Sequence, residues 1–121
     1  MNVLVVEDDP SSLKLAHLVL TADGANVNSV DAAHKVLAAI ERDKPEVILL
    51  DLTLPDMDGL ALVRKLKGNP QTKDIPIVAI TAFPNTWSRE KVLAAGCSAY
   101  IVKPMDTRSI AGELRRAAQG S

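Results

Sequence analysis

Polar side chains that could act on a phosphoryl group follow four short apolar segments of this chain. They are the acidic run Glu7-Asp8-Asp9, the carboxylate of Asp51, the hydroxyl of Thr81 and the ammonium of Lys103. Carboxylates that lie close together repel one another, which raises their pKa values unless a cation lies among them. Hard oxygen ligands that leave room for water and phosphate suit Mg²⁺ better than a dedicated calcium site, with Mn²⁺ as the alternative. The pattern therefore indicates a magnesium site, provided that the fold brings these residues together.

Asp51 is the natural nucleophile of such a site. A carboxylate can attack phosphorus and form an acyl phosphate when a metal and a cation neutralise the charge on the transferring oxygens. Lys103 can supply the cation and Thr81 a hydroxyl donor. Phosphoryl transfer demands mostly positioning and electrostatic stabilisation, which rigid strand ends provide. These residues predict phosphoryl transfer onto Asp51, and a plain surface ion pair with Lys103 is the alternative.

The apolar segments alternate with longer amphipathic stretches, which predicts an α/β fold with helices on both faces of a parallel sheet. In such a doubly wound sheet, functional residues gather at the carboxyl ends of the strands. The third segment reads Val-Ile-Leu-Leu without polar alternation, which is typical of a strand buried on both faces. The predicted strands are Val3–Val6, Ala25–Ser29, Val47–Asp51, Ile77–Thr81 and Ala99–Val102.

Capping signals predict where the helices begin and end. A capping aspartate or a proline marks the predicted starts at Asp9-Pro10, Asp31, Asp58 and Asp106. A glycine able to take the left-handed conformation marks the predicted ends at Gly24, Gly68 and Gly96. Periodicity predicts core stripes of Leu15, Ala16, Val19 and Leu20 in the first helix, and of Ile110, Ala111 and Leu114 in the last. Leu13 and Leu18 fall outside the stripe, either as scattered surface leucines or as a docking face.

The bulk composition predicts a single domain over residues 1–121, because this is an ordinary domain length. Basic and acidic residues are balanced, at 14 and 15, so no basic surface for direct nucleic-acid binding is expected. No apolar run approaches the roughly 20 residues of a membrane span, and no signal-peptide pattern opens the chain. We therefore expect a soluble, cytoplasmic protein without a membrane partner. Cys97 is the only cysteine and is predicted to be a buried packing residue.

Four stretches resemble the receiver domains of two-component response regulators. They are VVEDDP at residues 5–10, LDLTLPDMDG at 50–59, ITA at 80–82 and YIVKP at 100–104. The resemblance extends over nearly the whole chain and implies a flavodoxin-like fold with a parallel sheet in the order 2-1-3-4-5 and five helices. Around Thr81-Ala82-Phe83 and Gly96-Cys97 the sequence is similar to single-domain cell-cycle regulators and to receiver modules of hybrid kinases.

The resemblance also implies a role for individual residues around the metal. Asp51 is the phosphoacceptor, and Asp8 and Asp51 bind Mg²⁺ directly. Thr53 contributes its backbone carbonyl, and Glu7 acts through a water molecule.

Around the phosphoryl group, the resemblance implies that Thr81 hydrogen-bonds it in the active state and that Lys103 pairs with it. The backbone N–H of Ala82 donates to it, and the Lys103–Pro104 peptide is cis. Tyr100 matches the aromatic switch that turns inward when Thr81 moves, with an ordinary half-buried aromatic as the alternative.

A two-component function follows from the resemblance. A histidine kinase or a histidine phosphotransfer protein would dock near Asp51 and transfer the phosphoryl group. The resulting switch would change binding of a downstream protein through the face of the fourth helix, fifth strand and fifth helix. No enzymatic activity is expected beyond the domain's own phosphorylation and dephosphorylation.

One segment departs from the family pattern. Phe83-Pro84-Asn85-Thr86-Trp87 places bulky and rigid residues directly after Thr81-Ala82. Proline restricts Phe83 to extended geometry and removes a backbone donor, so the amplitude or rate of the switch is expected to differ. The three aromatic residues, Phe83, Trp87 and Tyr100, all lie between the fourth and fifth strands. Their clustering favours a partner surface, with chance placement as the alternative.

Other function classes fit less well. Metal-dependent aspartyl-phosphate phosphatases of the haloacid dehalogenase type resemble one another in having a second aspartate two residues after the nucleophile. In this chain that position is Thr53. A receiver-like module that binds without phosphorylation would normally lack an acid or the lysine of the site. A flavodoxin-like nucleotide binder would need a glycine-rich phosphate loop after the first strand, where this chain has acids.

Overall fold

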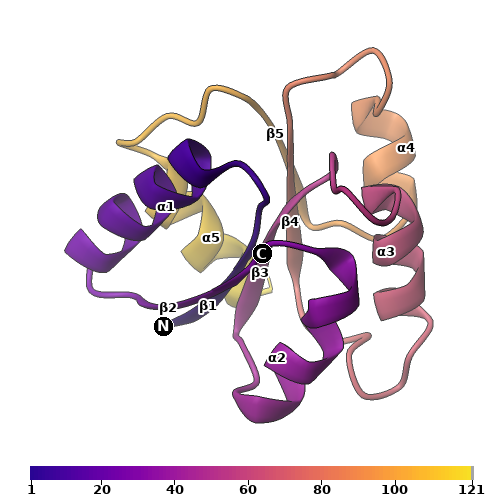
Figure 1. Cartoon of the computed structure of the whole chain (residues 1–121), viewed down its shortest axis with the longest axis horizontal. Coiled ribbons are helices and arrows are strands. Elements are labelled where there is room, and N and C mark those ends of the chain that lie inside the picture. Colours follow the sequence, from indigo (N-terminus) through magenta and orange to yellow (C-terminus); the bar gives the residue numbers. More distant parts are fainter. Residues whose placement is uncertain (121) are drawn as a thin grey trace.

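The computed structural model describes residues 1–120 as an α/β fold. A parallel sheet of five strands in the order β2-β1-β3-β4-β5 lies between two layers of helices (Figure 1). The strands are β1 (Asn2–Val6), β2 (Asn26–Val30), β3 (Val47–Asp51), β4 (Ile77–Thr81) and β5 (Ala99–Val102). The helices are α1 (Pro10–Ala22), the short 3₁₀ helix η1 (Ala33–Lys35), α2 (Val36–Arg42), α3 (Gly59–Lys67), α4 (Arg89–Ala94) and α5 (Ile110–Ala118). The predicted fold class and strand order are confirmed.

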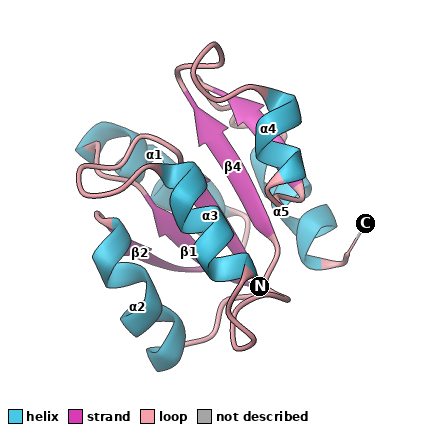
Figure 2. Cartoon of the chain, turned by 90° about the vertical axis from the view of Figure 1, so that its right-hand side faces the viewer, coloured by secondary structure: helices cyan, strands magenta, loops and turns pink. Residues whose placement is uncertain are grey.

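Alternation along the central strands divides the core into two layers. In β1, Leu4 and Val6 face the layer under α2, α3 and α4, whereas Val3 and Val5 face the layer under α1 and α5. The separation of the helices into these two groups is plain from both views of the chain (Figures 1 and 2). Every residue of β3 and β4 is buried, as the unbroken apolar run of the third segment predicted.

The strand register places the predicted functional residues at one edge of the sheet. Asp51 at the end of β3 pairs with Ile80 of β4, and Thr81 pairs with Val102 of β5. Val6 ends β1 beside Leu50 of β3, so Glu7 leaves the sheet next to Asp51. The carboxyl ends of β1, β3, β4 and β5 therefore meet where the polar side chains emerge.

The predicted bounds of β3, β4 and β5 agree with the structure, and those of β1 and β2 differ by one residue. Two of the predicted helix starts are confirmed, since the side chains of Asp9 and Asp58 accept from backbone N–H groups at the starts of α1 and α3. The start predicted at Asp31 is wrong, because Asp56 from a distant loop caps η1 and Asp31 instead pairs with Lys35.

The remaining start, predicted at Asp106, lies one turn too early. Asp106 accepts from the backbone N–H of Arg108, and α5 begins only at Ile110. Local hydrogen bonding by an aspartate supports either a turn or a helix start, so the sequence alone does not separate the two.

The prediction for the helix ends holds at two glycines. Gly24 and Gly96 have φ values of 92° and 116°, in the left-handed region. Gly68 ends α3 with an ordinary φ of −85°, so its predicted left-handed conformation is wrong.

The predicted core stripe of α1 is wrong for Leu15, which is 40% exposed, whereas Leu13 packs against the core layer under α1 and α5. The buried stripe follows the spacing of three and four residues from Leu13 through Ala16 to Leu20, which turns Leu15 and Leu18 outward. The stripe of α5 is confirmed, with Ile110 and Leu114 buried and Ala111 packed beside them. Cys97 is buried, as predicted. None of the helices in residues 1–120 is both long enough and apolar enough to cross a membrane.

Candidate phosphoryl and metal site

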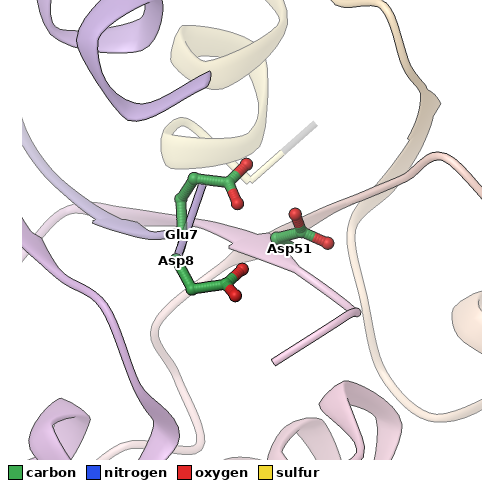
Figure 3. A group of neighbouring side chains, drawn as sticks. All are labelled: Glu7, Asp8 and Asp51. Carbon is green, nitrogen blue, oxygen red and sulfur yellow. The ribbon is translucent and has the colours of Figure 1, made fainter. Parts of the chain in front are cut away.

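Three carboxylates meet at the carboxyl edge of the sheet. Glu7 and Asp8 leave the end of β1, and Asp51 ends β3 (Figure 3). One carboxylate oxygen from each residue lies within 4.8 Å of the other two. Glu7 and Asp51 are only 5% and 4% exposed, whereas Asp8 is exposed to solvent. The structure therefore brings Glu7, Asp8 and Asp51 together, as predicted, whereas Asp9 of the same acidic run caps α1 instead.

Lys103 reaches into this cluster from the end of β5. Its Nζ donates to Glu7 Oε1 and to Asp51 Oδ2, each at 2.7 Å. Burial alone would lower the pKa of Lys103, but the hydrogen bonds to Asp51 and Glu7 outweigh it and raise that pKa. The Lys103–Pro104 peptide is cis, as the resemblance implied. The ammonium is thus fixed between two buried carboxylates.

Glu7 holds the most perturbed carboxyl group of the site. Burial raises its pKa to about 7, and the neighbouring Asp51 carboxylate adds to the rise, while the hydrogen bond from Lys103 opposes it. Glu7 Oε2 also accepts from the backbone N–H of Asp9 at 3.1 Å. In the metal-free protein, the single positive charge of Lys103 does not balance the buried carboxylates.

The β3–α3 loop (residues 52–58) folds back against the end of β3. The backbone N–H of Thr53 donates to Asp51 Oδ1 at 2.8 Å, and Thr53 forms an antiparallel bridge with Asp58. Gly59 packs against the backbone of Leu52 so closely that a Cβ at this position would lie 2.4 Å from Leu52 Cα. This packing fixes the backbone of Thr53 beside the carboxylate of Asp51.

Thr81 lies at the end of β4 and is fully buried. Its Oγ accepts from the backbone N–H of Phe83 at 2.8 Å, and its carbonyl accepts from the N–H of Lys103 at 2.8 Å. Ala82, whose N–H is predicted to meet the phosphoryl group, is exposed next to it. The hydroxyl thus lies at the same sheet edge as Asp51 and Lys103, while holding the loop that follows.

Tyr100 is half-buried and lies in β5, two residues before the end of the strand. Its hydroxyl donates to the backbone carbonyl of Trp87 at 2.6 Å, and its ring packs against the core layer under α2, α3 and α4. The predicted switch residue is therefore tied to the β4–α4 loop (residues 82–88).

Sequence reasoning missed two loop contacts. Asp56 accepts from the backbone N–H groups of Ala33 and His34, both at 2.9 Å, and lies 2.8 Å from His34 Nδ1. The Trp87 Nε1 donates to Asp58 Oδ1 at 3.2 Å. Asp58 was predicted as a helix cap and Trp87 as a partner anchor, and neither was predicted to contact the other. Their partners lie more than 20 residues away, and no local pattern in the sequence signals such contacts.

The donor set fits a hard divalent cation. All three side chains offer carboxylate oxygens, and within residues 1–120 no side chain donates a hydrogen bond to Asp8. Within residues 1–120 the exposed carboxylate of Asp8 accepts no hydrogen bond, and it lies beside two buried carboxylates, so oxygen lone pairs and a local excess of negative charge are available to an ion. These are the ligands and the charge that Mg²⁺ prefers.

The chain belongs to the response regulator receiver domain family, whose model matches residues 3–115. It is 37% identical over 114 residues to the response regulator PleD of Caulobacter vibrioides, covering 94% of this chain and 25% of PleD. It is 32% identical over 104 residues to the polar-differentiation response regulator DivK of Brucella ovis, covering 86% of this chain and 85% of DivK.

Among solved structures, the receiver domain of the sensor histidine kinase PA1611 from Pseudomonas aeruginosa PAO1 matches with a TM-score of 0.87 at 30% identity. The match covers 99% of this chain and 98% of that domain, whose active-site cleft coordinates a magnesium ion. The chain is thus a receiver domain of two-component signalling, as the resemblance predicted. It spans only a quarter of the length of PleD, so the activities of such longer proteins do not transfer to it directly.

Proposed function

We propose that this receiver domain accepts a phosphoryl group on Asp51 from a histidine kinase or a histidine phosphotransfer protein. The observation that supports this most strongly is the asymmetry around Asp51. One of its carboxylate oxygens pairs with Lys103, while the carboxylate of Asp8, which accepts no hydrogen bond within residues 1–120, lies close by. A permanent cation on one side and a metal-binding carboxylate on the other are what an attacking carboxylate requires.

In the proposed transfer, an Asp51 oxygen attacks phosphorus as the P–N bond of the phosphohistidine breaks. The bonding electron pair returns to the imidazole nitrogen, which takes up a proton from solvent. Lys103, already 2.7 Å from Asp51, would pair with the incoming phosphoryl oxygens. Thr81 would donate its hydroxyl hydrogen, and the backbone N–H of Ala82, an exposed residue, would donate beside it.

The metal ligands in this proposal are Asp8, Asp51 and the backbone carbonyl of Thr53, with Glu7 acting through water. Bound Mg²⁺, or Mn²⁺ in its place, would neutralise charge on the transferring oxygens. The magnesium-bound receiver domain of PA1611 supports the choice of ion. The activity proposed is limited to the domain's own phosphorylation and dephosphorylation, and the family match gives no support to the phosphatase alternative.

Leu15 and Leu18 are the better candidates for a docking face on α1. Their side chains are 40% and 62% exposed, and Leu15 lines a groove of about 340 Å³ together with Ser12, Lys103, Pro104 and Met105. The predicted use of Leu13 needs correction, because Leu13 packs against the core and its replacement by aspartate would disturb folding. Leu18→Asp is expected to slow transfer from a protein donor but not from phosphoramidate. Equal rates from the protein donor would argue against this face.

The output proposed is binding of a downstream protein through α4, β5 and α5. Two large apolar side chains near this face are exposed, Phe83 at 53% and Val102 at 45%. The balanced charge supports a protein partner and not direct nucleic-acid binding. We propose that the domain acts in the cytoplasm, without a membrane partner.

Intact mass spectrometry tests the central claim. The chain is incubated with phosphoramidate and Mg²⁺, and Asp51→Asn and Asp56→Asn are treated identically. Wild type and Asp56→Asn are expected to gain one phosphoryl group that hydroxylamine removes, whereas Asp51→Asn gains none. Asp56 is the matched control, because it is an aspartate of the loop after β3 that lies outside the carboxylate cluster. Equal labelling of Asp51→Asn would overturn the proposal.

A further inference from the structure

Trp87 joins two loops that flank the proposed site. Its side-chain Nε1 donates to Asp58 Oδ1 at the start of α3, at 3.2 Å. Its backbone carbonyl accepts from the hydroxyl of Tyr100 on β5, at 2.6 Å. The residue is half-buried, and its ring packs against the core layer under α2, α3 and α4. One residue therefore contacts α3 with its side chain and the predicted switch residue with its main chain.

On the α3 side, Asp58 connects Trp87 to Thr53, whose carbonyl is a proposed metal ligand. Asp58 Oδ1 accepts from Leu60 N–H at 2.8 Å as well as from the indole, so one oxygen both caps the helix and holds Trp87. The antiparallel bridge of Asp58 with Thr53 leads to the N–H of Thr53, which donates to Asp51 Oδ1. The indole of Trp87 thus helps to fix the position of the Thr53 backbone, through Asp58.

On the other side, the contacts of Trp87 lead back to the same aspartate. Its N–H donates to the carbonyl of Phe83, whose own N–H donates to Thr81 Oγ. The Thr81 carbonyl accepts from Lys103 N–H, and Lys103 Nζ donates to Asp51 Oδ2. The contacts form a closed ring that begins on one carboxylate oxygen of Asp51 and ends on the other.

We propose that Trp87 is a positioning residue that couples Mg²⁺ binding at the β3–α3 loop to the placement of Tyr100. The inference rests on the proposed function, because it takes the Thr53 carbonyl as a metal ligand. The indole bond holds Asp58, and through it Thr53, ready for the ion before the ion binds. A protein whose binding-competent loop is already populated binds its ligand more tightly. The coupling is reciprocal, so bound Mg²⁺ changes the surroundings of Trp87 and Tyr100.

The geometry of the hydrogen bond between Trp87 and Asp58 explains why it can change when Mg²⁺ binds. A length of 3.2 Å is at the long end for an N–H···O bond, and the bond lies at the exposed edge of the molecule. Its acceptor is a carboxylate, which strengthens it, but solvent competes for both partners. A contact of this strength contributes to the population of one loop arrangement without locking it.

Isothermal calorimetry of Mg²⁺ binding, without any phosphoryl donor, is the first test. Trp87→Phe keeps an aromatic ring and the backbone carbonyl but loses the N–H donor. It is expected to weaken Mg²⁺ binding roughly threefold to tenfold, the size of one ordinary hydrogen bond, because solvent competes for this exposed contact. Tyr100→Phe is expected to weaken binding in the wild-type background and to have no further effect in Trp87→Phe.

Two aspartate variants serve as matched partners. Asp58→Asn retains a good helix cap while removing the acceptor's charge, so it is expected to weaken Mg²⁺ binding in the same direction. Asp74→Asn removes the same charge from an exposed aspartate before β4, at the opposite edge of the sheet, and is expected to leave binding unchanged. The free energy of unfolding, measured by urea for every variant, separates lost coupling from a damaged fold.

Spectroscopy adds a signal that a merely structural role would not produce. Trp87 is the only tryptophan, so its indole gives a single ¹⁵N–¹H resonance. We expect this resonance to move on addition of Mg²⁺, and to be displaced already in metal-free Asp58→Asn. Its fluorescence should change when Mg²⁺ and beryllofluoride are added together.

The outcomes separate this inference from the proposed function. Normal Mg²⁺ binding by Trp87→Phe, or an indole resonance that Mg²⁺ does not move, would overturn the coupling and leave phosphorylation of Asp51 standing. Labelling of Asp51→Asn by phosphoramidate would remove the proposed function while these binding results stood. A wild-type chain that does not bind Mg²⁺ would remove both.

Discussion

The strand ends and the loops that follow them hold their polar side chains in different ways. Glu7, Asp51 and Thr81 are at most 5% exposed and are fixed by a sheet with neighbours on both sides. In the loop after β3, Asp56 and Asp58 are exposed, and hydrogen-bond contacts hold them, three to Asp56 and two to Asp58. The groups proposed to meet the phosphoryl group are therefore positioned in advance. Asp58 and Trp87, which are proposed to respond to Mg²⁺, are joined by an exposed hydrogen bond for which water competes.

Gly59 marks the boundary between the two regions, and its replacement should have the largest effect. A Cβ at Gly59 would lie 2.4 Å from Leu52 Cα and 2.6 Å from its carbonyl oxygen, and backbone atoms cannot rotate away. We expect Gly59→Ala to lower the free energy of unfolding by about 3 kcal/mol, as overpacking does. Urea denaturation measures the change, together with a loss of Mg²⁺ affinity as the loop leaves the end of β3.

Gly112 provides the matched control within helix α5. The nearest atom to a Cβ there is Arg116 Nη1 at 3.8 Å, an ordinary contact. Gly112→Ala should therefore raise the free energy of unfolding by about 0.5 to 1 kcal/mol, from helix propensity. Similar effects of the two substitutions would show that the loop is not anchored at Gly59.

Lys103 tests the buried side of the comparison. Removing its charge leaves the buried carboxylates of Glu7 and Asp51 without their cation. We expect Lys103→Met to lower the free energy of unfolding by about 2 kcal/mol, below the usual range for buried pairs because Glu7 can take up a proton. Lys35→Met removes an exposed pair with Asp31 and should leave the free energy of unfolding almost unchanged, because solvent screens the pair. Equal losses at neutral pH would contradict the distinction between buried strand ends and exposed segments.

The same division explains what the sequence could predict of the fold. Strand bounds follow from runs of β-branched and apolar residues, and three of them agree with the structure to the residue. The cap of η1 could not be predicted, because Asp56 supplies it from 22 to 23 residues away. The predicted inward face of α1 is wrong at Leu15, because residues adjacent in sequence point in different directions on a helix and packing follows the three- and four-residue spacing from Leu13.

The sequence predicted the position of those site residues that lie at or just after the end of a strand. Glu7, Asp8, Asp51, Thr81 and Lys103 all lie at the predicted sheet edge because parallel strands align their carboxyl ends. The ring of contacts through Trp87 was invisible, since it depends on how two loops fold over that edge. The structure shows where these residues lie, and the roles of all of them, like those of Thr53, Ala82 and Tyr100, remain predictions.

Asp8 sharpens the comparison, because it is the exposed member of the cluster and has no donor within residues 1–120. In EDTA, Asp8→Asn should raise the free energy of unfolding by about 1 kcal/mol, the size of one relieved repulsion near the surface. Added Mg²⁺ should stabilise the wild type by mass action and leave Asp8→Asn unchanged. Urea denaturation with and without Mg²⁺ measures both effects. Equal stabilisation of the two chains by Mg²⁺ would exclude Asp8 as a ligand.

Asp56 in the β3–α3 loop is expected to give the smallest effect on stability, and the effect depends on pH. The backbone N–H of Ala33, the side chain of His34 and its N–H lower the pKa of Asp56 from 3.8 to about 2. Because the folded pKa is depressed, the stability that this carboxylate contributes is present above about pH 4. It is lost as the pH falls through about 2. The stability difference between wild type and Asp56→Asn should therefore shrink over that window. In His34→Ala, the pKa of Asp56 should move part of the way back toward 3.8, which carboxyl ¹³C NMR measures. A titration unchanged by His34→Ala would show that the backbone N–H groups alone hold this loop against η1.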